Sequence, residues 1–218
     1  MFKLAPSILS ADFANLQRDV KKAEDAGAEY LHIDVMDGAF VPNITIGAPV
    51  VKALRPHCSL VFDVHLMINN PEKHLADFAA AGADIITIHL EAADNAYEVL
   101  KQIAALGIRP SLSIKPATPV EAVYPFLDLV SMILIMSVEP GFGGQTFIES
   151  TLPKISALRQ KINDSKKDIE IQIDGGVNLS NINKIVKAGA DVIVAGSAVF
   201  GAQDITAAVQ KLRAEGSL

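Results

Sequence analysis

Short runs rich in β-branched residues alternate with helical patterns along the whole chain. We predict eight strands from these runs, at residues 4–8, 30–35, 60–66, 84–89, 110–114, 130–136, 169–174 and 192–195. Helical patterns separate most of them, over residues 13–26, 71–81, 95–106, 151–162, 180–188 and 204–213. The helices after the second and fifth strands are expected to be short. Because parallel strands need crossover connections, this alternation favours a parallel sheet.

The length of the chain favours a closed sheet over an open one. Eight strand–helix units in 218 residues average roughly 27 residues each, which suits a minimal closed (β/α)₈ barrel. The junction Ala-Gly-Ala at residues 26–28, 81–83 and 188–190 places a glycine where a helix ends before a predicted strand. We therefore predict an α/β protein with a single domain, a (β/α)₈ TIM barrel over residues 1–218.

The composition limits the partners and the location of the protein. Hydrophobic residues make up 50% of the sequence and the mean hydropathy is +0.31, which indicates a large core and a homo-oligomer with an apolar interface. The 19 basic and 25 acidic residues are spread along the chain, without a basic cluster suited to nucleic acid. Cys58, the one cysteine, is interpreted as a small buried hydrophobe in a reducing compartment. We expect a cytoplasmic protein that binds neither nucleic acid nor a membrane, since no apolar run approaches about 20 residues.

Polar residues lie where the predicted strands end, and the carboxyl ends of the strands hold the active site of such a barrel. These residues are Ser7, His32, Asp34, His65, His89, Lys115, Ser137 and Asp174. His32 and Asp34 lie two positions apart, so both side chains project to the same face of their strand. With His65 and Asp174, they form a set that suits one divalent metal ion per subunit, Zn²⁺, Fe²⁺, Mn²⁺ or Co²⁺. Any one of these histidines alone would more readily be a hydrogen-bonded core residue, but four inward groups on three strands favour a metal.

Other polar residues of the strands support further hypotheses. Asp63 shares a face with His65, so its carboxylate is a candidate for orienting a ligand histidine. Alternation along residues 169–174 directs Gln172 and Asp174 into the barrel. A core role and a substrate contact are equally consistent with the sequence for His89, whereas Lys115 is interpreted as a charge at the barrel rim.

Glycine-rich turns follow the last three predicted strands. Their members are Gly141, Phe142, Gly143 and Gly144 after the sixth strand, Gly175 and Gly176 after the seventh, and Gly196 with Ser197 after the eighth, where a short helical segment begins. Such turns let backbone N–H groups point inward and bind an anion. The final strands of a barrel are also its usual phosphate-binding position. The sequence thus predicts a phosphate site here, with residues 141–146 as a candidate lid.

At these motifs the sequence resembles the ribulose-phosphate 3-epimerase family. The resemblance runs from residues 5–12 to residues 194–197, and its most specific segments are HIDVMDG at 32–38, FVPN at 40–43, DVHLM at 63–67, EPGFGGQ at 139–145 and DGG at 174–176. It implies a metal-dependent isomerase of the pentose phosphate pathway that interconverts D-ribulose 5-phosphate and D-xylulose 5-phosphate. It also implies dimers or hexamers.

The residues give the implied reaction a chemical basis. Inverting a carbon beside a ketone requires one group to remove a proton and another to return one to the opposite face. Asp34 and Asp174 are the candidate catalytic pair, and His32, Asp34, His65 and Asp174 are the candidate metal ligands. Substrate contacts are expected from Ser7 and His65, from an apolar wall of Met36, Met67 and Met136, and, at the phosphate, from Gly141, Phe142, Gly143, Gly144, Gly175, Gly176, Gly196 and Ser197.

Two alternatives stay open at this point. An allulose-6-phosphate 3-epimerase would apply the same chemistry to a ketose with one more carbinol group. A barrel that binds sugar phosphates without turning them over would use the same phosphate site, although the presence of all four candidate ligands argues against it.

Overall fold

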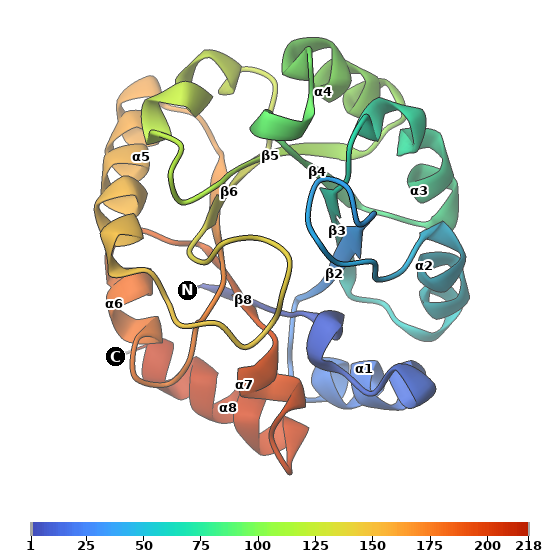
Figure 1. Ribbon diagram of the computed structural model, residues 1–218. Helices are drawn as coiled ribbons and strands as arrows, with labels where there is room; N and C mark the ends of the chain where they lie inside the picture. Colours follow the sequence, from blue (N-terminus) through green and yellow to red (C-terminus); the bar gives the residue numbers. More distant parts are fainter. Residues whose placement is uncertain (1, 218) are drawn as a thin grey trace.

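A ring of parallel strands surrounded by helices makes up the computed structural model, which describes residues 2–217 (Figure 1). Its strands are β1 (Lys3–Pro6), β2 (Tyr30–Met36), β3 (Val61–Met67), β4 (Ile85–His89), β5 (Arg109–Ile114), β6 (Met132–Met136), β7 (Glu170–Asp174) and β8 (Val192–Ala195). Its α-helices are α1 (Leu16–Asp25), α2 (Ala48–Leu54), α3 (Leu75–Ala81), α4 (Ala96–Ala105), α5 (Leu152–Ser165), α6 (Ile182–Lys187), α7 (Ser197–Phe200) and α8 (Ile205–Gly216). The strands pair in the order β1-β8-β7-β6-β5-β4-β3-β2, and a bridge between Ser7 and His32 brings β1 beside β2. The predicted TIM barrel is confirmed.

Several predicted elements differ from the observed ones at their ends. β1 stops at Pro6 because a 3₁₀ turn, Ile8–Ser10, follows at once, and the Ser7 side chain caps that turn. The helices predicted to begin at residues 13 and 71 open with 3₁₀ turns, so their α-helical parts start later. The connections after β2 and β5 contain little helix, as expected. After β5 only the 3₁₀ segment Val120–Phe126 forms, and it contains a proline that cannot donate an α-helical hydrogen bond.

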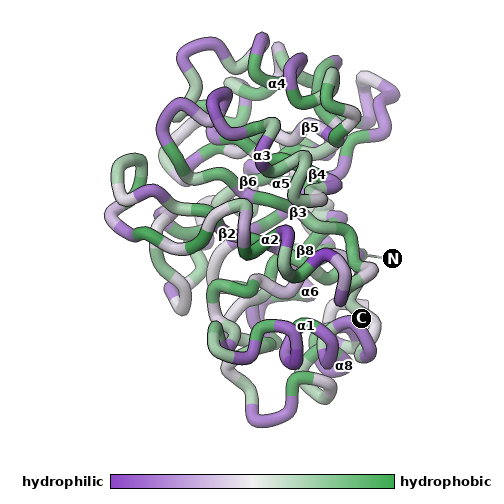
Figure 2. The backbone as a smooth tube through the Cα atoms, turned by 90° about the vertical axis from the view of Figure 1, so that its right-hand side faces the viewer, coloured by the Kyte–Doolittle hydropathy of each residue, from purple (hydrophilic) through white to green (hydrophobic). Residues whose placement is uncertain are grey.

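The core has one layer outside the barrel and another inside it. Outward side chains of the strands, such as Ile171 and Ile173, belong to a cluster that includes Ile155 and Leu158 of α5. Figure 2 shows the same division along the backbone, with hydrophobic colour along the strands and hydrophilic colour on outer turns and helices. At its amino end the barrel is filled by a separate cluster that includes Tyr30. Polar side chains are therefore left to line the carboxyl end.

Two further local features agree with the sequence. The three Ala-Gly-Ala junctions lie where α1, α3 and α6 end, and Gly82 has a φ of +100° there. Cys58 is buried, as predicted. Among residues 2–217, no helix has the length and apolar character needed to cross a membrane.

Candidate active site

Four of the predicted side chains meet at the carboxyl end of the barrel. His32 and Asp34 come from β2, His65 from β3 and Asp174 from the end of β7. One nitrogen or oxygen atom from each lies within 4.8 Å of the others. Both histidines are completely buried, whereas the Asp174 side chain is 15% exposed. The strand alternation that predicted this set is therefore correct, and the barrel brings its members together.

The donor atoms of this cluster face one point. Oδ1 of Asp34 lies 3.2 Å from Nε2 of His32 and 3.1 Å from Nδ1 of His65. Oδ2 of Asp174 lies 3.7 Å from Nε2 of His32 and 3.8 Å from Nδ1 of His65. Within the described part of the chain, Nε2 of His32 is buried without a hydrogen-bond partner. Two imidazoles, two carboxylates and this unpaired nitrogen fit a divalent cation.

The electrostatics of the cluster favour positive charge at its centre. Burial opposes a charge on the imidazole, but the Asp34 and Asp63 carboxylates raise the pKa of His32 well above its ordinary value. Burial also disfavours the Asp34 carboxylate, yet His32 and His65 lower the pKa of Asp34 below its usual range. A proton on Nε2 of His32 and a bound metal ion would each place positive charge beside the Asp34 carboxylate.

A second row of side chains lies behind the cluster. Oδ2 of Asp63 lies 2.7 Å from Nδ1 of His32 and accepts a hydrogen bond from Nε2 of Gln172 at 2.6 Å. An acceptor on Nδ1 leaves Nε2 of the neutral ring free to face the cluster. Asp63 thus contacts a candidate ligand histidine, as predicted. That histidine is His32, on the neighbouring strand β2.

Ser7 contacts the cluster directly. Its Oγ donates a hydrogen bond to Oδ2 of Asp34 at 2.6 Å. The sequence predicted a sugar contact for Ser7, and Ser7 does line the pocket in front of the cluster. The structure adds a contact that the sequence did not predict, because the bridge between Ser7 and His32 forms only where β1 closes the ring against β2.

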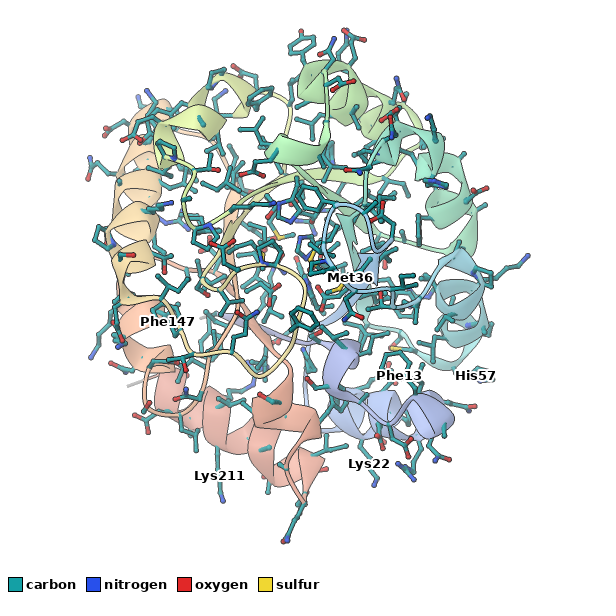
Figure 3. All side chains as sticks on the ribbon, viewed as in Figure 1. Phe13, Lys22, Met36, His57, Phe147 and Lys211 are labelled. Atoms are coloured by element: carbon teal, nitrogen blue, oxygen red, sulfur yellow. The ribbon has the colours of Figure 1, made fainter. Side chains whose placement is uncertain are left out.

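A pocket extends from this cluster across the barrel mouth. Met36, Met67 and Met136 form its apolar side and are nearly completely buried. Met36 lies close to the centre of the ring in Figure 3. The three methionines thus lie where an apolar wall was expected.

The predicted glycine cluster lines the same pocket. Its members there are Gly141, Phe142, Gly143, Gly144, Gly175, Gly176, Gly196 and Ser197. Gly176 has a φ of +68°, and a Cβ there would lie 2.3 Å from the backbone nitrogen of Phe147. No larger residue fits this turn without displacing that backbone. The segment after β6 crosses in front of the barrel interior in Figure 1, where the candidate lid was predicted.

The structure also shows where His89 and Lys115 lie relative to the pocket. His89 is completely buried and lies beside His65, away from the pocket lining. Lys115 lies at the rim, with its Nζ 4.1 Å from the centre of the Phe40 ring. Sequence reasoning missed Leu9, Ser10, Val138 and Val177, which line the pocket from loops and strand ends. Three of them are apolar and the serine lies beyond the end of its strand, so only the folded chain identifies them.

Known proteins resemble this chain over nearly its whole length. A family model described as the Ribulose-phosphate 3 epimerase family matches residues 3–200. The chain is 46% identical over 214 residues to the ribulose-phosphate 3-epimerase of Bacillus subtilis, an alignment that covers 98% of this chain and 99% of that protein. It is 49% identical over 212 residues to the ribulose-phosphate 3-epimerase of Synechocystis, covering 96% of this chain and 92% of that protein.

Solved structures that are more distant in sequence share the fold. One is orotidine 5′-phosphate decarboxylase from Pyrococcus horikoshii, which aligns over 100% of both chains with a TM-score of 0.70 and 16% sequence identity. At that identity the likeness concerns the barrel alone.

Proposed function

This chain belongs to the ribulose-phosphate 3-epimerase family, and on that premise we propose that it interconverts D-ribulose 5-phosphate and D-xylulose 5-phosphate at the mouth of its barrel. Members of the family are isomerases. The observation that carries the proposal is the pair of carboxylates, Asp34 on β2 and Asp174 on β7, that face one glycine-lined pocket. Their position supports proton transfer at a carbon held between them.

Asp34 and Asp174 are the proposed acid–base pair. One carboxylate removes the C3 proton on its side of the substrate, and the other, protonated, returns a proton to the opposite face. The roles exchange when the reaction runs backwards. The hydrogen bond from Ser7 holds one oxygen of Asp34 in place.

His32, Asp34, His65 and Asp174 are the proposed ligands of one divalent ion, and Zn²⁺, Fe²⁺, Mn²⁺ and Co²⁺ all suit this set. A bound ion would supply Lewis-acid stabilisation of the negative charge that develops on the carbonyl oxygen beside C3. The three methionines of the pocket exclude water from the planar face of the substrate. Backbone N–H groups of the glycine turns bind the phosphate, and residues 141–146 close over it.

Transfer of solvent deuterium into C3 of D-ribulose 5-phosphate, followed by NMR, tests the proposal together with detection of D-xylulose 5-phosphate. The wild-type protein should show both, and removal of metal by a chelator should abolish both. Asp34→Asn and Asp174→Asn should each lower turnover by about 10²–10⁴-fold. The matched control is Asp25→Asn on α1, whose side chain is 63% exposed. Near-normal turnover in either site variant contradicts the two-base scheme, and activity of protein shown to be metal-free contradicts the metal role.

The same assay decides between the alternatives. A higher kcat/KM for allulose 6-phosphate than for ribulose 5-phosphate would replace the proposed substrate. Absence of exchange with either substrate in metal-loaded protein would identify a barrel that binds without catalysis.

Assembly as a homo-oligomer, whether dimer or hexamer, and a cytoplasmic location stay predictions of the sequence. Light scattering on a sizing column measures the mass of the particle. One chain is 23.2 kDa, so a particle of that mass would contradict the predicted oligomer.

A further inference from the structure

His89 contacts the proposed metal ligand His65 from the side away from the pocket. It ends β4, is completely buried, and places its Nε2 2.9 Å from Nε2 of His65. The other nitrogen of His65, Nδ1, faces Asp34 Oδ1 at 3.1 Å. The two nitrogens of His65 therefore have different partners, the carboxylate cluster on one side and His89 on the other.

Glu91 extends this row of side chains to the barrel rim. Its Oε2 lies 3.3 Å from Nδ1 of His89. Its Oε1 accepts hydrogen bonds from the backbone N–H of Lys115, at 2.8 Å, and from the Thr118 hydroxyl. Burial would raise the pKa of Glu91, but these contacts, with His89 the strongest, lower it to about 2. Glu91 is therefore an ionised acceptor at neutral pH.

The hydrogen atoms along this row can be placed in sequence. A neutral His65 that presents the lone pair of Nδ1 to a cation carries its proton on Nε2 and donates it to His89. Nε2 of His89 must then accept, so the proton of His89 lies on Nδ1. From there it is donated to Glu91, which has only acceptors. Each ring thus has one tautomer, and the carboxylate at the end of the row selects it.

We propose that Glu91, acting through His89, is a positioning residue that fixes the tautomer of His65 and thereby the affinity of the cluster for a divalent cation. The inference rests on the proposed function, in which Nδ1 of His65 is a metal ligand. The ring of Phe40 packs 4.9 Å from that of His89, centre to centre. His89 is completely buried, whereas the Glu91 side chain is 23% exposed, so Glu91 forms the outer end of the row.

Glu91→Gln discriminates this role from simple packing because it keeps the shape of the side chain. The backbone N–H of Lys115 can only donate, so the amide oxygen stays on it and the amide NH₂ turns toward His89. His89 must then accept at Nδ1 and carry its proton on Nε2. Nε2 of His65 becomes the acceptor, which moves the proton of His65 to Nδ1, where the cation would bind.

The experiment titrates Zn²⁺ into metal-free protein against a competing chelator and records long-range ¹H–¹⁵N NMR spectra of the histidine rings. Wild-type protein should show the proton of His89 on Nδ1. Glu91→Gln should show it on Nε2 and should bind Zn²⁺ about 10–100-fold more weakly. Glu98→Gln on α4, with a side chain that is 54% exposed, is the matched control and should match the wild type in both measurements.

Thr118→Val and His89→Phe complete the test. Thr118→Val removes one donor to Glu91 but leaves the carboxylate and the Lys115 N–H, so the tautomers should be unchanged.

His89→Phe keeps a ring in the core and removes the acceptor of His65, so Zn²⁺ affinity should fall as in Glu91→Gln. This variant decides the question if Glu91→Gln does not fold. Folded Glu91→Gln protein with wild-type affinity and tautomers overturns this inference alone. Wild-type protein that binds no Zn²⁺ overturns the proposed metal site itself.

Discussion

Asp34 shows how much of the candidate active site depends on single side chains. Its Oδ1 faces two histidines, its Oδ2 accepts the Ser7 hydroxyl, and its backbone oxygen accepts a hydrogen bond from the Thr45 hydroxyl. Strand alternation predicted which way this carboxylate points, because His32 and Asp34 differ by two positions. The partner from β1 was not predictable in the same way. A closed barrel places the first strand beside the second, but nothing in the local sequence of residues 4–8 specifies the register that brings Ser7 opposite His32.

Ser7→Ala tests the contribution of that partner at the residue scale. A hydrogen bond to an ionised group contributes about 1.5–3 kcal/mol, so its loss should lower kcat about 10–100-fold by freeing the Asp34 carboxylate to rotate. Steady-state kinetics measure the effect, and thermal unfolding checks that the fold is kept. Ser156→Ala is the matched control, because this exposed hydroxyl on α5 donates its hydrogen bond to the backbone oxygen of Ala188, away from the site. A wild-type kcat in Ser7→Ala would show that the contact plays no part in turnover.

The strands carry a second polar cluster at the end of the barrel opposite the candidate site. Glu170 begins β7, and its carboxylate accepts hydrogen bonds from Lys3 on β1, from the Tyr30 hydroxyl at 2.8 Å on β2 and from Arg109 at 2.6 Å on β5. These elements are separated by up to 167 positions in the chain. The sequence predicted each strand, whereas the contact across the barrel exists only because the ring closes.

Glu170→Gln should therefore destabilise the barrel in a pH-dependent way. Burial would raise the pKa of Glu170, but Lys3, Arg109 and Tyr30 lower it overall. A carboxylate with a lowered folded-state pKa stabilises the protein above its unfolded-state pKa, and this stabilisation is lost as the pH falls through the folded-state value. We expect Glu170→Gln to lose about 1–3 kcal/mol of unfolding free energy at pH 7 and to converge with the wild type in acid.

Urea unfolding at several pH values measures this difference. The control is Asp128→Asn. The Asp128 side chain, which is 82% exposed, forms an ion pair with Lys167, and its replacement should change the free energy of unfolding by less than about 1 kcal/mol. A Glu170→Gln deficit that stays constant down to acidic pH would contradict the electrostatic explanation.

At the scale of the whole molecule, the last helix completes the ring. Helix α8 lies beside α1 in Figure 1, so the two ends of the chain meet on one side of the barrel. Arg213 on α8 forms an ion pair with Glu29, which directly precedes β2. Val209 and Leu212 of α8 belong to the same hydrophobic cluster as buried residues of α1 to α6. We infer that the barrel unfolds as one cooperative unit that includes its C-terminal helix.

Leu212→Ala tests this cooperativity. Leu212 is 1% exposed, so truncation should cost about 2–5 kcal/mol through lost burial and a residual cavity. Far-ultraviolet circular dichroism and tyrosine fluorescence should report one shared transition, shifted to lower denaturant. Leu106→Ala is the control at a position that is 42% exposed, where the cost should be well below that of Leu212→Ala. Two separate transitions in Leu212→Ala would show that α8 unfolds independently of the barrel.

The sequence by itself determined the eight strands, most of the helices between them and the direction of the side chains on each strand, because these follow from local periodicity. It therefore identified His32, Asp34, His65 and Asp174 as one inward-facing set. Only the tertiary structure decided which side chains meet behind that set. The contacts of Asp63 with His32 and Gln172, and of His65 with His89, join different strands at distances fixed by register and closure. Local sequence patterns carry no information about such distances, whereas hydrogen bonding and metal binding depend on them.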